Sequence, residues 1–180
     1  MCADSNRSRH VNGNVRVRHE TELDWPAVHA VNRSAFGTSV EANIVDALRR
    51  KSSRLISLVA EVDGVLVGHI MFSPVSLEEH RDINIMGLAP MAVAPPQQGK
   101  GIGAALVVEG LSECRRLGCR AVVVLGHPEY YPRFGFDRAA NYGIRSEWDV
   151  PDDVFMITEL EAGALHGVTG VIGYDAAFAG

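Results

Sequence analysis

The sequence predicts an α/β (α+β) fold in which a mixed, mostly antiparallel sheet is flanked by helices. Two features predict it: a hairpin signal at Asp63-Gly64, and an apolar run that passes through a glycine loop at residues 99–103 into a helix and then a short apolar strand. Hairpins pair antiparallel strands, whereas a strand–loop–helix–strand unit pairs parallel ones. A chain that contains both is therefore expected to form a mixed sheet with helices on its faces.

Composition and charge exclude several classes of protein. The 180 residues suit one domain with a substantial core, and 47% apolar and 22% charged residues are ordinary globular values. The net charge of −5 argues against general nucleic-acid or anionic-membrane binding. No apolar run approaches the roughly 18 residues of a membrane span, and no signal-like segment or cysteine metal pattern is found. We expect a reduced, cytoplasmic protein with no metal site and no membrane or nucleic-acid partner.

The first third of the chain should contain a leader, a strand and two helices. Residues 1–13 are polar and unpatterned, which predicts a flexible leader before a single domain at 14–180. Alternating apolar residues predict a strand at Val15–His19. A partly helical apolar spacing from Trp25 predicts a helix that ends at Gly37, and a second helix is predicted after Ser39, with basic residues at its C-terminal end that suit the helix dipole.

The middle of the chain should form a hairpin and then the strand–loop–helix unit. The β-rich runs 55–62 and 65–75 flank Asp63-Gly64, a dipeptide typical of two-residue turns with positive φ. A strand over 83–93 follows and leads into the glycine loop. The helix behind the loop should end at Leu117-Gly118.

The last third should complete the sheet. The continuous apolar run Ala121–Leu125 predicts a strand buried on both faces, which Gly126-His127-Pro128 ends. The region 141–151 reads as a loop, and Val154–Thr158 as another strand. The glycine-rich end, 166–178, is expected to form a terminal strand or hairpin, which could also pair between subunits of a homodimer.

The glycine loop should bind an anion. Glycines at 99, 101 and 103 let the backbone turn tightly, and the helix behind them offers unpaired N–H groups and a positive dipole end. This combination suits pyrophosphate, although such a turn can also serve packing alone. Gly99, Gly101 and Ala104 match part of a dinucleotide fingerprint, but no ribose-binding acid ends the next strand, which disfavours a nucleotide-dependent oxidoreductase. A Walker loop is excluded because no Ser or Thr follows a Gly-Lys pair.

Two segments resemble a known family. Gln98-x-x-Gly101-x-Gly103, preceded by Met91-Ala-Val-Ala-Pro95, resembles the acetyl-coenzyme A loop of the GNAT superfamily of N-acetyltransferases. Tyr131-Pro-Arg-Phe-Gly-Phe136 resembles that family's Tyr-x-x-x-Gly-Phe segment, and the closest likeness is to a bacterial group with a Gly-His-Pro-x-Tyr-Tyr-x-Arg-Phe-Gly-Phe stretch. The resemblance covers most of the chain and implies a GNAT-like acyl-coenzyme A N-acyltransferase fold.

The resemblance implies that the protein transfers the acetyl group of acetyl-coenzyme A, its cosubstrate, to a primary amine of a small molecule or protein. Tyr131 stands four residues before Gly135, where the family has its general acid. A phenol pKa of about 10 against a thiol pKa of about 8.5 makes a tyrosine a plausible proton donor to the leaving sulfur. The alternative is a non-catalytic acyl-coenzyme A binding or sensing module on the same fold.

The resemblance also implies which residues bind the cofactor. Loop amides should hold the pyrophosphate, with Lys100 adding charge or simply lying in solvent. Main-chain groups of the preceding strand should hold the pantetheine arm, and one N–H there should polarise the thioester carbonyl. Tyr130 is included in this set, and which of Tyr130 and Tyr131 is the acid stays open. The set is Met91, Ala92, Val93, Gln98, Gly99, Lys100, Gly101, Ile102, Gly103, Ala104 and Tyr130.

Other residues have more open roles. His127 ends the buried strand and is the candidate base, because histidine ordinarily titrates near neutral pH; a turn-stabilising role is the alternative. Arg133 could reach a phosphate or the sheet edge. His69, inside a strand, is expected to be a satisfied core or sheet-face histidine. Candidates for the acceptor pocket, placed by analogy with the family, are Phe36, Glu41 and Phe72.

Overall fold

The computed structural model describes residues 10–11, 15–52 and 54–179. The expected leader thus lies outside the described residues except for His10–Val11, which form strand β1 and pair antiparallel with Val15 and Arg16. The main sheet runs in the order β1-β2-β3-β4-β5-β6-β9-β7. Its other strands are β2 (Val15–His19), β3 (Ile56–Val62), β4 (Val65–Leu77), β5 (Ile85–Val93), β6 (Ala121–Leu125), β9 (Phe155–Glu159) and β7 (Asp137–Arg138).

The sheet is mixed, as predicted. Every neighbouring pair on this path is antiparallel except β5 and β6, which are parallel. The hairpin turn between β3 and β4 has φ of 51° at Asp63 and 78° at Gly64, which confirms the predicted turn with two positive φ values. The parallel pair arises because a helix crosses over between the two strands.

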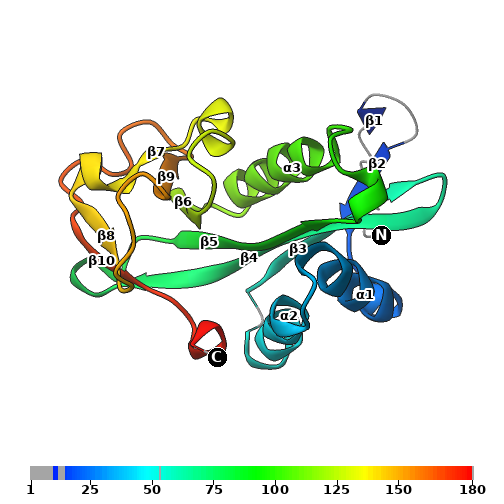
Figure 1. The fold of residues 1–180 in the computed structure, drawn as a ribbon. Helices are drawn as coiled ribbons and strands as arrows, with labels where there is room; N and C mark the ends of the chain where they lie inside the picture. The colour runs from blue at the N-terminus through cyan, green and yellow to red at the C-terminus, as the bar shows by residue number, and fades with distance from the viewer. Residues whose placement is uncertain (1–9, 12–14, 53, 180) are drawn as a thin grey trace, which may run out of the picture.

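The helices cover both faces of this sheet (Figure 1). α1 (Trp25–Phe36) and α2 (Val40–Lys51) lie on one face, and α3 (Ile102–Arg116) lies on the other. All three predicted helices are confirmed. The short 3-10 turns are η1 (Glu22–Asp24), η2 (Glu78–His80), η3 (Pro95–Gln97), η4 (Tyr131–Phe134), η5 (Ala139–Tyr142) and η6 (Ala176–Phe178).

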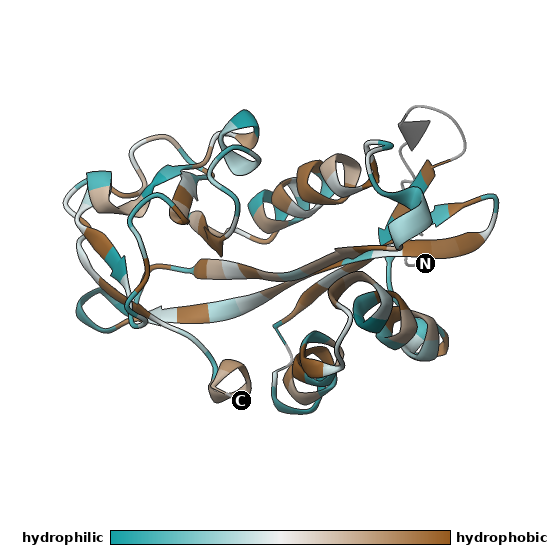
Figure 2. Ribbon diagram, viewed as in Figure 1, coloured by the Kyte–Doolittle hydropathy of each residue, from teal (hydrophilic) through white to brown (hydrophobic). Residues whose placement is uncertain are grey.

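The core has a layer on each face of the sheet. Hydrophobic residues follow the central strands and the helix faces turned towards them (Figure 2). In β6, Val122 and Val124 pack under α3, whereas Ala121 and Val123 pack on the opposite side. All four are at most 1% exposed, which confirms that this strand is buried on both faces.

At the far end of the sheet, the predicted terminal strand is present as β10 (Gly170–Gly173), but the short strand beside it was not predicted. The region 141–151 is not all loop, because Ile144–Ser146 form β8. β8 pairs parallel with β10 (Gly170–Gly173), which also pairs antiparallel with Ser76 and Leu77 of β4. Both edges of the terminal strand are therefore occupied within the chain, which removes the edge on which we based a possible homodimer.

Close packing of α3 on the sheet gives a stability prediction. A Cβ added at Gly110 would lie 2.3 Å from a ring atom of Phe72, which is fully buried. Alanine gains up to about 1 kcal/mol of helix propensity over glycine, but overpacking costs about 1–3 kcal/mol. We expect Gly110→Ala to lower the free energy of unfolding by about 1–2 kcal/mol in urea denaturation. Val108→Ala, on the exposed face of the same helix, should change it by less than about 0.5 kcal/mol. Equal stability of the two variants would contradict this packing.

Candidate active site

Strands β5 and β6 separate halfway along β5. They pair only from Ile85 opposite Ala121 to Leu88 opposite Val124, whereas β5 remains paired with β4 as far as Val93. The β4–β5 register shifts just beyond Leu88, where β5 carries an extra residue. Among the described strands, the second half of β5 therefore has no neighbour on one of its edges.

Two hydrogen bonds show which backbone N–H and C=O groups of β5 face this open edge. The Ala94 N–H donates to the Val67 carbonyl of β4 at 2.8 Å. Because backbone groups of a strand alternate in direction, those of Ala92 also face β4, and those of Met91 and Val93 face the opening. Consistently, the Val93 carbonyl accepts a hydrogen bond from Gln98 Nε2 at 3.0 Å. The side chain of Gln98 thus ties the loop to the end of β5.

The glycine loop has the conformation that an anion site needs. Gly99 and Gly101 have φ of +74° and +83°, values that side chains with a Cβ rarely adopt. The first hydrogen bond of α3 runs from the Ala105 N–H to the Gly101 carbonyl at 3.0 Å. The N–H groups of residues 102–104 therefore have no helical acceptor and face outwards at the positive end of the helix.

Tyr131 lies across the opening from this loop. The His127 carbonyl accepts the N–H of Tyr130 at 3.0 Å, which closes the turn before η4. The Tyr131 ring lies directly over Gly126, where a Cβ would approach it to 2.2 Å, and meets Phe136 edge-on. Burial raises the pKa of Tyr131 to about 12, and the neighbouring Tyr130 adds to the rise. Its hydroxyl is therefore a neutral donor throughout the physiological range.

Tyr130 bridges η4 and α3. Its hydroxyl lies 2.9 Å from the position that a Cβ would take at Gly103, so the third glycine of the loop is needed for this contact. The guanidinium carbon of Arg133 lies 3.9 Å from the centroid of the same ring and 4.9 Å from that of Phe134. The face of the Tyr130 ring therefore contacts the Arg133 guanidinium, and its hydroxyl contacts the glycine loop.

These elements enclose one cleft of about 470 Å³. None of its lining residues is acidic, so this is a locally favourable place for an anion in a chain of net charge −5. The lining residues are Met91, Val93, Gln97, Gln98, Gly99, Gly101, Ile102, Gly103, Ala104, His127, Tyr130, Tyr131 and Arg133.

The cleft differs from the predicted residue set at four residues, one of which is Arg133, a lining residue whose role the sequence had left open. Ala92 does not line it, because its backbone faces β4 and it is only 2% exposed. Lys100 does not line it either, and its Nζ donates to Gln97 Oε1 at 3.1 Å. Gln97 lines the cleft but was not predicted, although its position directly before the Gln98-x-x-Gly101-x-Gly103 motif could have indicated it.

The other candidate residues divide between core and surface. His69 is fully buried between Asn32 Nδ2, at 3.1 Å, and Ser57 Oγ, at 2.9 Å. Burial lowers its pKa to about 3, with the charge of Arg49 adding to the shift, so it is neutral, and its predicted structural role is confirmed. Phe72 lies under α3, so its assignment to an acceptor pocket was wrong. Phe36 is 42% exposed and, with the half-buried Glu41, remains only a prediction.

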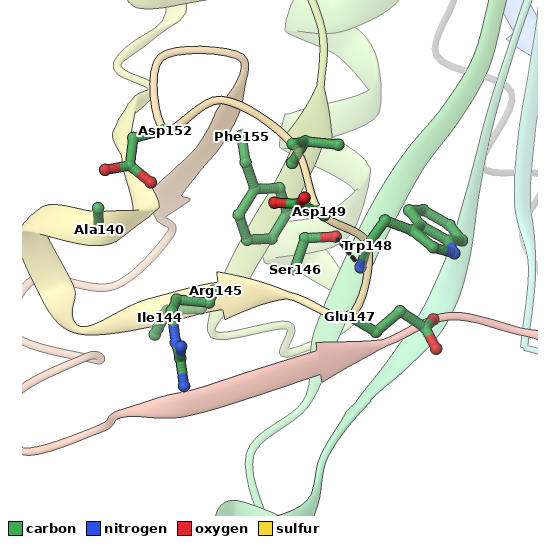
Figure 3. Close-up of a pocket in the computed structure, with 10 residues that line it drawn as sticks. Ala140, Ile144, Arg145, Ser146, Glu147, Trp148, Asp149, Asp152 and Phe155 are labelled. Carbon is green, nitrogen blue, oxygen red and sulfur yellow. Dashed lines mark hydrogen bonds between the residues drawn. The ribbon is translucent and has the colours of Figure 1, made fainter.

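A second cavity, of about 330 Å³, lies between β8 and the start of β9 (Figure 3). Its carboxylates are Glu147, Asp149 and Asp152. Glu147 Oε1 accepts the N–H of Tyr174 at 2.5 Å and so ties β10 to this segment. A cavity with three carboxylates would repel a phosphate-bearing ligand, so the cleft at the glycine loop is the better anion site.

Two further observations concern metal binding and membrane spans in the described residues. Across 10–11, 15–52 and 54–179, no group of three or more His, Cys, Asp or Glu side chains is arranged to hold a metal ion. Within the same ranges, the helices are too short or too polar to cross a bilayer.

Comparisons with known proteins agree on one family. The model of the acetyltransferase (GNAT) family matches residues 16–136. The uncharacterised N-acetyltransferase YhbS of Escherichia coli is 37% identical over 163 residues, which is 90% of this chain and 97% of YhbS. The crystal structure of E. coli YhbS in complex with coenzyme A has a TM-score of 0.89 at 35% identity, with 96% of each chain covered. A Brucella melitensis GNAT acetyltransferase in complex with acetyl-coenzyme A has a TM-score of 0.77 at 34% identity, with 93% and 99% covered.

Proposed function

Because the chain belongs to the GNAT family of acetyltransferases, we propose that it transfers the acetyl group of acetyl-coenzyme A to a primary amine of a small molecule or a protein. It has the GNAT fold that the sequence predicted, and it is an acyltransferase. One observation carries the proposal: a single cleft brings together the glycine loop, the free edge of β5 and Tyr131.

The cleft offers a place for each part of acetyl-coenzyme A. The N–H groups at the start of α3 hold the pyrophosphate, which the dipole also favours. The pantetheine arm follows the free edge of β5, where the backbone groups of Met91 and the N–H of Val93 are available to its amides, while the Val93 carbonyl accepts from Gln98. One of these N–H groups polarises the thioester carbonyl as negative charge develops on its oxygen. Two relatives were crystallised with coenzyme A and acetyl-coenzyme A, which supports acetyl-coenzyme A as the cosubstrate.

The reaction needs two proton movements. A neutral amine attacks the acetyl carbon, the C–N bond forms, and the C–S bond then breaks with its electron pair leaving on sulfur. Tyr131 acts as the acid towards that sulfur: its raised pKa keeps the hydroxyl protonated at neutral pH, so its O–H donates to the negative charge that develops there. The proton lost by the amine goes to His127, directly or through water.

The base role gives a pH prediction. A base must be unprotonated to act, so kcat/KM should rise with pH until the base has lost its proton. We expect His127→Ala to remove this rise with pH. The maximum kcat/KM should fall by no more than roughly a hundredfold, because His127 is exposed and water can take up the proton in its place. His166→Ala, an exposed histidine outside the cleft, should leave the profile unchanged. A rising limb that survives in His127→Ala would remove the base role.

The proposed activity is tested by product detection. Acetyl-coenzyme A is incubated with the protein and a panel of amines: amino sugars, polyamines, amino acids and peptides with a free N-terminus or lysine. Mass spectrometry should find an acetylated amine whose formation depends on the protein, together with free coenzyme A. If acetyl-coenzyme A binds in the cleft but every amine class remains unmodified, the non-catalytic binding module is the better account.

A further inference from the structure

The cleft contains a cation that the proposed chemistry does not use. Arg133 comes from η4, lines the cleft, and is exposed. Its guanidinium lies against the rings of Tyr130 and Phe134, at 3.9 and 4.9 Å from their centroids. In the described part of the chain, no carboxylate lies within ion-pair distance of it. Stacking thus holds a guanidinium at the cleft wall with its N–H donors unused by any acid.

This cation is separate from the glycine loop. The Tyr130 hydroxyl touches Gly103 in the first turn of α3, while Arg133 lies over the face of the same ring. The glycine loop therefore lies at the tip of the phenol ring, and the guanidinium lies over its face. The cleft thus offers an anion two different kinds of donor, the backbone N–H groups of the loop and the side chain of Arg133.

Coenzyme A carries phosphate in two places. Its pyrophosphate lies within the chain that leads to pantetheine, and its third phosphate is a monoester on the ribose. The loop suits the pyrophosphate, which leaves the guanidinium for the monoester. A phosphate monoester carries about −1.5 to −2 charge at neutral pH and binds a guanidinium through two parallel hydrogen bonds.

We propose that Arg133 binds the ribose 3′-phosphate and is the residue by which this protein distinguishes coenzyme A from 3′-dephospho-coenzyme A. The inference rests on the proposed function, since it presumes that the cleft binds coenzyme A. The other cation near the cleft, Lys100, is hydrogen-bonded to Gln97 and does not line it, so it is a matched control.

The test is calorimetric titration of both ligands into three proteins: wild type, Arg133→Gln and Lys100→Gln. We expect wild type to bind coenzyme A at least about tenfold more tightly than 3′-dephospho-coenzyme A, as a charge-assisted hydrogen bond allows. Arg133→Gln should bind both ligands equally, with the loss confined to coenzyme A. Lys100→Gln should keep the wild-type ratio. Arg133→Lys retains the charge without the two-pronged geometry and should give an intermediate ratio.

Several results would overturn the inference. If Arg133→Gln weakens both ligands by the same factor, the guanidinium contacts the pyrophosphate or supports Tyr130 instead. If it changes neither affinity, or if wild type binds the two ligands equally, no 3′-phosphate contact exists. If wild type binds neither ligand, the proposed function itself fails, which is a different outcome from a changed ratio. Because Arg133 is exposed, the fold should survive its substitution, and circular dichroism checks this.

Discussion

Gly101→Glu is expected to abolish binding of acetyl-coenzyme A, with a loss of affinity of at least about a hundredfold, or about 2.8 kcal/mol. The wild-type backbone has φ of +83° here, a conformation that costs a residue with a Cβ about 1–2 kcal/mol. A loop that relaxes from this conformation no longer aims its amides at one point. The new carboxylate also repels the pyrophosphate at the position where the cleft otherwise has no acid. Calorimetric titration measures the effect.

Two variants separate these causes. Gly101→Ala introduces the strain without the charge and should lose less affinity than Gly101→Glu. Gly118 has φ of +73° and open space around it, but it lies beyond the other end of α3. Gly118→Glu therefore carries the same backbone strain and charge change outside the cleft, and it should bind acetyl-coenzyme A like wild type. Equal losses in the two glutamate variants would mean that the loop is not the binding site.

Tyr131→Phe is expected to lower kcat by roughly a hundredfold while coenzyme A affinity changes little. Removing a general acid costs about 10²–10⁴ in rate, and an interaction made only in the transition state affects kcat without altering ground-state binding. Phenylalanine keeps the ring that packs over Gly126 and against Phe136, so the fold should be retained. Initial rates with a reactive amine, together with a coenzyme A titration, provide both quantities.

The neighbouring tyrosine is the control for this experiment. Tyr130→Phe removes a hydroxyl that touches Gly103, so its effect should be on coenzyme A binding and its kcat should stay near wild type. The reverse pattern would transfer the acid role to Tyr130. An acid must be protonated to act, and the pKa of Tyr131 is about 12, so its ionisation should not reduce the rate until the pH approaches that value. An unchanged kcat in Tyr131→Phe would remove the acid from the mechanism.

Local sequence signals predicted most of the fold. Asp63-Gly64 specifies its turn through φ values that few other residues adopt, so the hairpin needs no information from distant residues. The run Ala121–Leu125 is apolar at every position, as a strand between two core layers must be. The glycines at 99 and 101 are required by backbone conformation, which a single sequence can show.

Features that depend on distant partners were missed. β8 is three residues long and forms because β10, more than 20 residues later, pairs with it. Phe72 was assigned to a pocket because nothing in its own segment shows that Gly110 of α3 packs against it. The place of Arg133 stayed open for the same reason, since its stacking on Tyr130 depends on the shape of η4. Ala92 was grouped with Met91 and Val93, although strand alternation alone could have separated them.

A crystal structure of this protein with coenzyme A would show whether the cleft is the catalytic site. We predict that the pyrophosphate lies on the N–H groups of residues 102–104, with the pantetheine arm along the free edge of β5 beside Met91 and Val93. The sulfur should lie within hydrogen-bonding reach of the Tyr131 hydroxyl. Coenzyme A bound at the cavity between β8 and β9, or bound at the loop with its sulfur directed away from Tyr131, would contradict the proposed catalytic site.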